Sequence, residues 1–175
     1  MARQAIRHEG DNAEERFRLF VKGSKKSDNA KLGDARVPVK GELRYVEIKE
    51  CHSNTINQIR AIKFIPLVIY NGQTWIVLPP HEIVRLVTKK SRGQHTEIPF
   101  ESANLSRNSI PKEFECSDSE LNARVQAAIK EGDRNADIAQ EMRNLLSQLQ
   151  KINQETKVRV EKLHKKTLAP KRRHL

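Results

Sequence analysis

The sequence has little of what marks several large classes of protein. Its two cysteines, Cys51 and Cys116, are too few for a disulfide framework or for a four-ligand zinc site. No run approaches the roughly 18 uninterrupted apolar residues of a membrane-spanning helix, and the first residues lack the apolar stretch of a secretory signal. We therefore expect a cytoplasmic protein with reduced thiols and no membrane contact.

Three common catalytic motifs are also missing. The sequence contains no G-x-x-x-x-G-K-[ST], no G-x-S-x-G and no H-E-x-x-H. The sequence therefore gives no support for a P-loop nucleotide triphosphatase, for a serine hydrolase with a G-x-S-x-G nucleophile or for a zinc protease.

Positive charge is abundant and unevenly placed. The 175 residues include 33 Lys and Arg against 22 Asp and Glu, a net charge of +11. Nine basic and two acidic side chains fall within residues 151–175, so this segment alone carries most of the excess. A basic protein of this kind favours a polyanionic partner, and we expect the basic segment to contact the backbone of a nucleic acid. A disordered tail that only aids solubility is the alternative.

The hydrophobic pattern predicts an α/β domain followed by helices. In chain order we expect a helix over 11–22, strands over 35–40 and 43–50, a helix over 55–64, strands over 67–70 and 74–78, and a helix over 81–89. A helix that crosses between two apolar strands favours a mixed central sheet flanked by helices. Residues 90–112 show no period and predict a long loop, followed by helices over 118–130, with a break at Gly132, and 135–163. This order predicts a domain over 1–115 and a helical, basic extension over 116–175.

One constellation in the first predicted hairpin carries chemistry. Asp34 opens one strand, and Glu47 and Lys49 flank a single apolar residue on the returning strand. Residues i and i+2 of a strand point to the same face, so Glu47 and Lys49 point together. A turn near Gly41 places position 34 roughly opposite 48, and all three side chains can then converge on one point.

This trio has the parts needed to cleave a phosphodiester. Two carboxylates, Asp34 and Glu47, suit a hard divalent cation such as Mg²⁺, with Mn²⁺ as an alternative. Such an ion polarises a phosphate and lowers the pKa of bound water. Lys49 beside it can position the attacking water, help to deprotonate it, or neutralise charge on the phosphorus oxygens.

The pattern Asp-x(n)-Glu-x-Lys, with an apolar residue on each side of Glu47, resembles the signature of the PD-(D/E)XK nucleases. These include many type II restriction endonucleases and the archaeal Holliday-junction resolvases. The resemblance covers residues 8–90 and implies a restriction-endonuclease-like α-β-β-α-β core. Residue 33 is Gly and not the Pro of the family's name.

The resemblance extends to two accessory positions. Gly10 and Glu14 are similar to a glycine and a helix-one glutamate that many members carry, which implies that Glu14 is an accessory ligand of metal or water. Gln58, placed near the start of the predicted helix over 55–64, is similar to a glutamine that several branches use near the scissile phosphate. We therefore expect Glu14 and Gln58 to assist the trio.

Two further regions are candidates for contact with DNA. The loop after the core carries side chains suited to phosphate and base contacts, and the last helix and tail carry basic ones. These candidates are Lys89, Lys90, Arg92, Gln94, His95, Lys165, Lys166 and Arg172.

The last long helix also bears an apolar stripe. Ile138, Met142, Leu145, Leu149 and Ile152 recur at spacings of four and three residues, a coiled-coil pattern. This stripe predicts either a homodimer seam or a face that folds back on the domain. Because one active site cuts one strand, cleavage of both strands favours the homodimer.

The sequence thus predicts a Mg²⁺-dependent DNA endonuclease, with a restriction-type enzyme as the first hypothesis. A structure-selective resolvase or repair nuclease is the second hypothesis. A third comes from a different class of protein: a non-catalytic, basic nucleic-acid-binding protein in which Asp34, Glu47 and Lys49 come together by chance. Dependence of cleavage on a divalent metal separates the third hypothesis from the first two.

Overall fold

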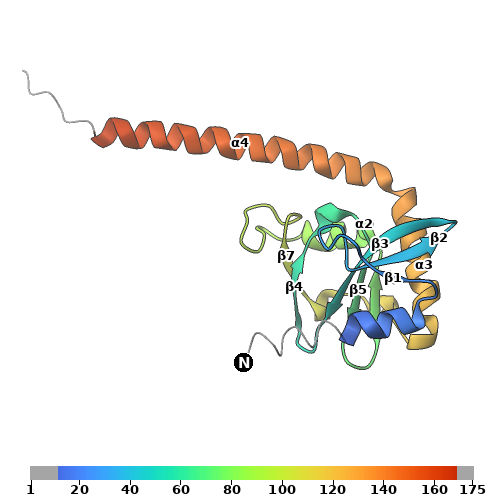
Figure 1. Cartoon of the computed structure of the whole chain (residues 1–175). Helices are drawn as coiled ribbons and strands as arrows, with labels where there is room; N and C mark the ends of the chain where they lie inside the picture. The colour runs from blue at the N-terminus through green and yellow to red at the C-terminus, as the bar shows by residue number, and fades with distance from the viewer. Residues whose placement is uncertain (1–11, 169–175) are drawn as a thin grey trace, which may run out of the picture. The chain divides into compact units, whose positions relative to one another are not determined.

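The computed structural model describes residues 12–168, and the chain divides into two compact units (Figure 1). The first unit ends at Ile138, and the second begins at Ala139 and contains most of helix α4, Ala136–Leu168. Helix α3, Asp118–Arg134, contributes Leu121, Val125 and Ile129 to the core of the first unit. The division therefore falls after α3, later than the boundary expected after residue 115.

A mixed six-stranded sheet forms the centre of the first unit, as the hydrophobic pattern predicted. Its strands lie in the order β1-β2-β3-β5-β6-β8. Their bounds are Lys25–Lys26, Ala35–Val39, Glu42–Glu50, Leu67–Tyr70, Trp75–Leu78 and Glu115–Cys116. Only the pair β3–β5 is parallel.

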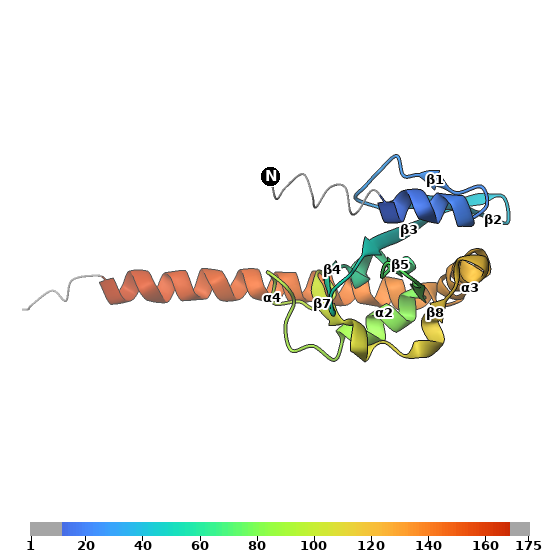
Figure 2. The same ribbon diagram turned by 90° about the horizontal axis from the view of Figure 1, so that it is seen from below.

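The two faces of this sheet are buried in separate cores because successive side chains of a strand alternate between them. On the first face, Val46, Ile48 and Val68 pack with Phe17 of the helix at residues 12–20 and with Leu121 of α3. On the second face, Leu67 and Ile69 pack with Ile83 and Leu86 of helix α2, Pro80–Val87. The helix at residues 12–20 and α2 accordingly lie on opposite sides of β3 (Figure 2).

The β2–β3 hairpin forms as predicted, but its register differs by one residue. The turn is centred on Lys40 and Gly41, which both have positive φ, 50° and 85°. A two-residue turn of this kind matches the twist of an antiparallel pair, and it sets Ala35 opposite Val46. Asp34 comes directly before this pair, and its N–H donates to the carbonyl oxygen of Val46.

The helix predicted over 55–64 is wrong. Strand β4, Thr55–Ile59, and a 3₁₀ turn η1, Ala61–Lys63, occupy this segment. Strand β4 pairs antiparallel with β7, Ala103–Ser106, which lies inside the segment predicted as a loop. The two strands bury Ile56, Ile59 and Leu105 on the second face of the sheet, so tertiary pairing overrides the helical spacing of the isoleucines. The α-β-β-α-β order expected from the resemblance is therefore not found, because β4 and η1 stand in place of the second helix.

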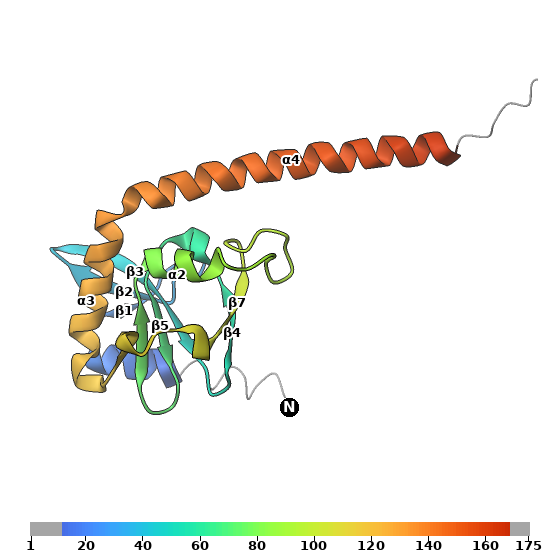
Figure 3. The same ribbon diagram turned by 180° about the vertical axis from the view of Figure 1, so that it is seen from behind.

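Short segments complete the second face. The chain between β7 and β8 includes two 3₁₀ turns, η2, Arg107–Ser109, and η3, Lys112–Phe114. Seen from behind, this connection crosses the β5–β6 hairpin (Figure 3).

Helix α3 does not end at Gly132, contrary to the expected break. A Cβ at this position would lie 2.9 Å from Cγ of Pro80, so the absent side chain lets α3 and the first turn of α2 approach closely.

The described part of the second unit, residues 139–168, is helical. Helix α4 exposes the predicted apolar residues Leu145, Leu149 and Ile152 to solvent. Within residues 12–168, no helix combines the length and the apolar character that crossing a membrane requires.

Candidate active site

The candidate site lies where strand β3 changes partners. Residues 42–46 of β3 pair with β2, and residues 47–50 pair with β5. Strand β2 begins at Ala35, so the β2 side of β3 is not paired to a strand beyond Val46. Glu47 and Lys49 point to the second face of the sheet at this change of partner, which we call the fork, and the carboxylate of Asp34 accepts a hydrogen bond there from the N–H of Ile48. The structure thus brings together the three residues that the sequence singled out.

Asp34 is fixed by its backbone and by its carboxylate. Its N–H donates to the carbonyl oxygen of Val46 at 2.9 Å, and its Oδ2 accepts a hydrogen bond from the N–H of Ile48 at 2.8 Å. The preceding residue, Gly33, is buried, and a Cβ there would lie 2.9 Å from the carbonyl oxygen of Val46. Glycine at position 33 therefore permits the close approach that positions Asp34.

Two lysines hold the carboxylate of Glu47. Lys49 Nζ lies 2.8 Å from Glu47 Oε1, and Lys63 Nζ lies 2.5 Å from Glu47 Oε2. The side chains of Glu47 and Lys63 are 13% and 11% exposed, whereas that of Lys49 is 28% exposed. Lys63 is thus the more deeply buried of the two partners, and Lys49 is the more accessible one.

The two carboxyl groups have pKa values shifted in opposite directions. Burial, together with the negative charge of Glu47, raises the pKa of Asp34 above its ordinary value. Burial alone would also raise the pKa of Glu47, but the ion pairs with Lys49 and Lys63 outweigh it and lower that pKa. The two lysines therefore favour the charged form of Glu47, whereas burial and the neighbouring Glu47 disfavour the charged form of Asp34.

The donor set fits one hard divalent cation. Asp34 and Glu47 are adjacent, partly accessible carboxylates, and Mg²⁺ is commonly held by one or two carboxylates with waters and substrate phosphate completing its shell. Among the residues that the structure describes, no group of three or more His, Cys, Asp and Glu side chains is placed to hold a metal ion. The fit is therefore to an open Mg²⁺ site whose shell is completed by water and can admit a substrate phosphate, and not to a closed protein cage.

Lys63 was missed by sequence reasoning, which placed it inside a helix. It belongs to η1, which ends at Phe64 in a left-handed conformation with φ of 50°. Backbone hydrogen bonds hold this turn, because Ile62 N–H donates to the carbonyl oxygen of Phe100 at 2.9 Å and Phe64 N–H to that of Ala61 at 2.9 Å. No local pattern marks Lys63, since its approach to Glu47 depends on the turn between β4 and β5.

The structure bears differently on the two accessory candidates, Glu14 and Gln58. Glu14 lies on the helix at residues 12–20, where its Oε2 is 3.8 Å from Arg18 Nη1, while Gly10 lies outside the described residues. The role of Glu14 beside the trio remains a prediction. Gln58 lies on β4, is exposed, and has a positive φ of 56°. It does not lie at the start of a helix, because that helix is absent.

The loop candidates are exposed, with the exception of Gln94. Lys89, Lys90, Arg92 and His95 are exposed after the end of α2. Gln94 is partly buried, and its Oε1 accepts a hydrogen bond from the N–H of Gln58 at 2.9 Å. Gln94 thus supports the irregular backbone of β4, and its side-chain oxygen is already in use.

The tail candidates are only partly described. Lys165 is exposed on α4, the side chain of Lys166 is not described, and Arg172 lies outside the described residues.

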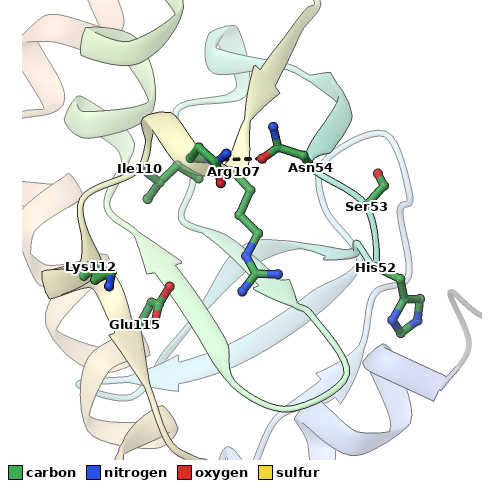
Figure 4. Close-up of a pocket in the computed structure, with 8 residues that line it drawn as sticks. His52, Ser53, Asn54, Arg107, Ile110, Lys112 and Glu115 are labelled. Carbon is green, nitrogen blue, oxygen red and sulfur yellow. Dashed lines mark hydrogen bonds between the residues drawn. The ribbon is translucent and has the colours of Figure 1, made fainter.

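A separate polar pocket of about 700 Å³ lies beyond the end of β3 (Figure 4). His52, Asn54, Arg107, Lys112 and Glu115 are among its lining residues. Asn54 connects the two walls of this pocket through two hydrogen bonds. The backbone oxygen of Asn54 accepts from the N–H of Arg107 at 2.8 Å, and its Oδ1 accepts from the N–H of Asn108 at 3.1 Å. The pocket suits a polar ligand, but its side chains do not include the paired carboxylates and lysines found at the fork.

Comparisons of the chain with protein-family models, with curated proteins and with solved structures each find no match. Any functional assignment therefore depends on the residues and their geometry.

Proposed function

We propose that the chain is a Mg²⁺-dependent nuclease that hydrolyses phosphodiester bonds in DNA. The observation that carries this proposal is the fork in β3, where the carboxylate of Asp34 accepts a hydrogen bond from the N–H of Ile48 at 2.8 Å and Lys49 Nζ lies 2.8 Å from Glu47 Oε1. Mn²⁺ is an alternative ion for the same carboxylates.

Each residue of the trio has a distinct role in this proposal. Asp34 and Glu47 would hold the divalent ion, which polarises the phosphate and lowers the pKa of bound water. Lys49, the more accessible lysine, orients the attacking water and neutralises charge on the phosphorus oxygens. The hydrogen bond from Ile48 N–H keeps the Asp34 carboxylate aimed into the fork.

Charge on the protein supports an anionic polymer as substrate. The chain carries a net charge of +11, and exposed Lys89, Lys90 and Arg92 follow α2. Such side chains bind phosphates with little regard to base sequence. We propose a restriction-type endonuclease first and a structure-selective resolvase or repair nuclease second, because the fork itself does not distinguish duplex from branched DNA.

A homodimer is the assembly that fits cleavage of both strands. Helix α4 leaves Leu145, Leu149 and Ile152 between 39% and 56% exposed on one stripe. In the proposal a second copy covers this stripe, as in a coiled coil. Sedimentation of the wild type and of Leu149→Glu tests the assembly, with a dimer that the substitution dissociates as the expected result.

The experiment that tests the activity compares two DNA substrates in Mg²⁺ and in EDTA. Supercoiled plasmid and a four-way junction are incubated with the wild type, with Lys49→Ala and with Lys130→Ala, a matched loss of one exposed lysine on α3. We expect Mg²⁺-dependent cleavage that is lost only in Lys49→Ala. Discrete plasmid fragments indicate a restriction enzyme, and cleavage of the junction alone indicates a resolvase.

No cleavage of either DNA, together with equal binding in Mg²⁺ and EDTA, would overturn the proposal. That result favours a non-catalytic, basic nucleic-acid-binding protein, whose affinity would fall steeply with salt.

A further inference from the structure

Lys63 gives the candidate site a fixed positive charge that the proposed chemistry does not by itself require. Its Nζ lies 2.5 Å from Glu47 Oε2, on the opposite oxygen from Lys49, and its side chain is only 11% exposed. We infer that Lys63 occupies the place of a second cation at Glu47, so that the site binds one divalent ion and not two. This inference rests on the proposed metal site.

The backbone around Lys63 is held in position. Lys63 N–H donates to the carbonyl oxygen of Arg60 at 3.1 Å within η1, and Glu47 N–H donates to the carbonyl oxygen of Pro66 at 3.0 Å. The first bond closes the turn that carries Lys63, and the second ties the segment just after this turn to the strand that carries Glu47. The ammonium group is therefore a built feature of the site.

Little space remains on the Lys63 side of Glu47. The cavity lined by Glu47, Lys63, Ile59 and Leu67 has a volume of about 10 Å³. A single water needs about that much room, and Mg²⁺ usually keeps several waters. A second hydrated ion cannot enter there unless the Lys63 side chain leaves.

A count of charges leads to the same stoichiometry. Asp34 and Glu47 together carry two negative charges, which Lys49 and Lys63 balance. One divalent ion then balances a phosphodiester and a hydroxide. A second divalent ion would leave two positive charges uncompensated at a mostly buried carboxylate, and the described residues offer no third acidic, His or Cys ligand there.

The test measures Mn²⁺ binding to the full chain by calorimetry and by electron paramagnetic resonance, without DNA. We expect one Mn²⁺ per wild-type chain and none at the fork in Asp34→Asn. Lys63→Gln keeps a hydrogen-bond donor for Glu47 but removes the charge. We expect it to bind Mn²⁺ about tenfold more tightly and to admit a second ion, because the repulsion from the ammonium is gone.

Two variants serve as controls. Arg60→Gln removes one exposed positive charge three residues earlier, and Lys63→Arg keeps the charge at position 63, so both should keep one ion with nearly wild-type affinity. Circular dichroism melts confirm that each variant is folded.

The outcomes separate this inference from the proposed nuclease. Two Mn²⁺ ions per wild-type chain, or unchanged binding in Lys63→Gln, would overturn the role of Lys63 even if DNA is cleaved. One ion per chain without cleavage of any DNA would leave the inference standing and overturn the nuclease. An absence of Mn²⁺ binding would overturn the inference and the metal-dependent mechanism together.

Discussion

Replacement of Asp118 tests the contacts that join three elements around the core on the first face of the sheet. Asp118 is the first residue of α3, and its Oδ1 accepts a hydrogen bond from Trp75 Nε1 at 2.7 Å. Its Oδ2 pairs with Arg16 of the helix at residues 12–20. One carboxylate thus links that helix, β6 and α3.

The expected loss of stability in Asp118→Ala follows from these contacts. Trp75 is fully buried, so its indole N–H would lose its partner at a cost of about 1–3 kcal/mol. Loss of the partly exposed pair with Arg16 adds up to about 1 kcal/mol, and loss of a negative charge in the first turn of α3 adds about 0.3–1 kcal/mol. We therefore expect the free energy of unfolding to fall by about 2–4 kcal/mol.

The same contacts set the pH dependence. Burial alone would raise the pKa of Asp118, but the hydrogen bond from Trp75 and the charge of Arg16 hold it below its ordinary value. A carboxyl whose pKa is lowered by folding stabilises the protein above its unfolded pKa of about 4, and it loses that effect as the pH falls through the folded pKa. The difference between wild type and Asp118→Ala should therefore be full at neutral pH and shrink below about pH 4.

Urea unfolding at several pH values measures this difference. Asp133→Ala is the matched control, because Asp133 is an exposed carboxylate in the last turn of α3 and lies 3.4 Å from Arg44. We expect the control to change stability by less than about 0.5 kcal/mol. A loss of less than about 0.5 kcal/mol in Asp118→Ala at neutral pH would show that Asp118 does not stabilise the fold in this way.

Three further predictions concern single positions. Gly33→Ala should lower stability by about 1–3 kcal/mol and reduce Mg²⁺-dependent cleavage, because its Cβ would lie 2.9 Å from the Val46 carbonyl oxygen; unchanged melts and rates would contradict this. Gly132→Ala should lower the melting temperature despite the better helix propensity of alanine, because a Cβ there lies 2.9 Å from Pro80 Cγ; a higher melting temperature would show that Pro80 gives way. Burial raises the pKa of Cys116 to about 11, so this thiol should react with a disulfide reagent at neutral pH only after unfolding; rapid labelling of the native protein, mapped by mass spectrometry, would argue against its burial.

Local patterns predicted those parts of the fold that local contacts determine. The β5–β6 hairpin follows from Asn71 and Gly72 between two apolar runs, and α2 from Pro80 and the apolar spacing after it. Asp34, Glu47 and Lys49 could be chosen from the sequence because the β2–β3 pair is also local. The one-residue error in its register arose because Lys40, a residue other than glycine, takes a positive φ of 50°.

The missed features depend on contacts between distant segments. Strand β4 forms against β7, where Thr55 lies opposite Ser106, so nothing within residues 55–64 indicates its partner. The same pairing redirects the chain into η1 and brings Lys63 to Glu47. The capping box of α3, formed by Ser117 and Glu120, is a signal that the sequence does contain.

The proposed nuclease requires that Glu47 acts in metal-dependent cleavage and does not only balance the charges of two lysines. The most direct measurement is the rate at which supercoiled DNA is cleaved in Mg²⁺ by the wild type, by Glu47→Gln and by Glu42→Gln. Glu42 is an exposed glutamate at the start of the same strand and serves as the matched control. If Glu47 holds the ion, the wild type and Glu42→Gln should cleave the DNA, and folded Glu47→Gln should lose at least about 100-fold in rate. Equal cleavage by all three proteins, or none by the wild type, would contradict it.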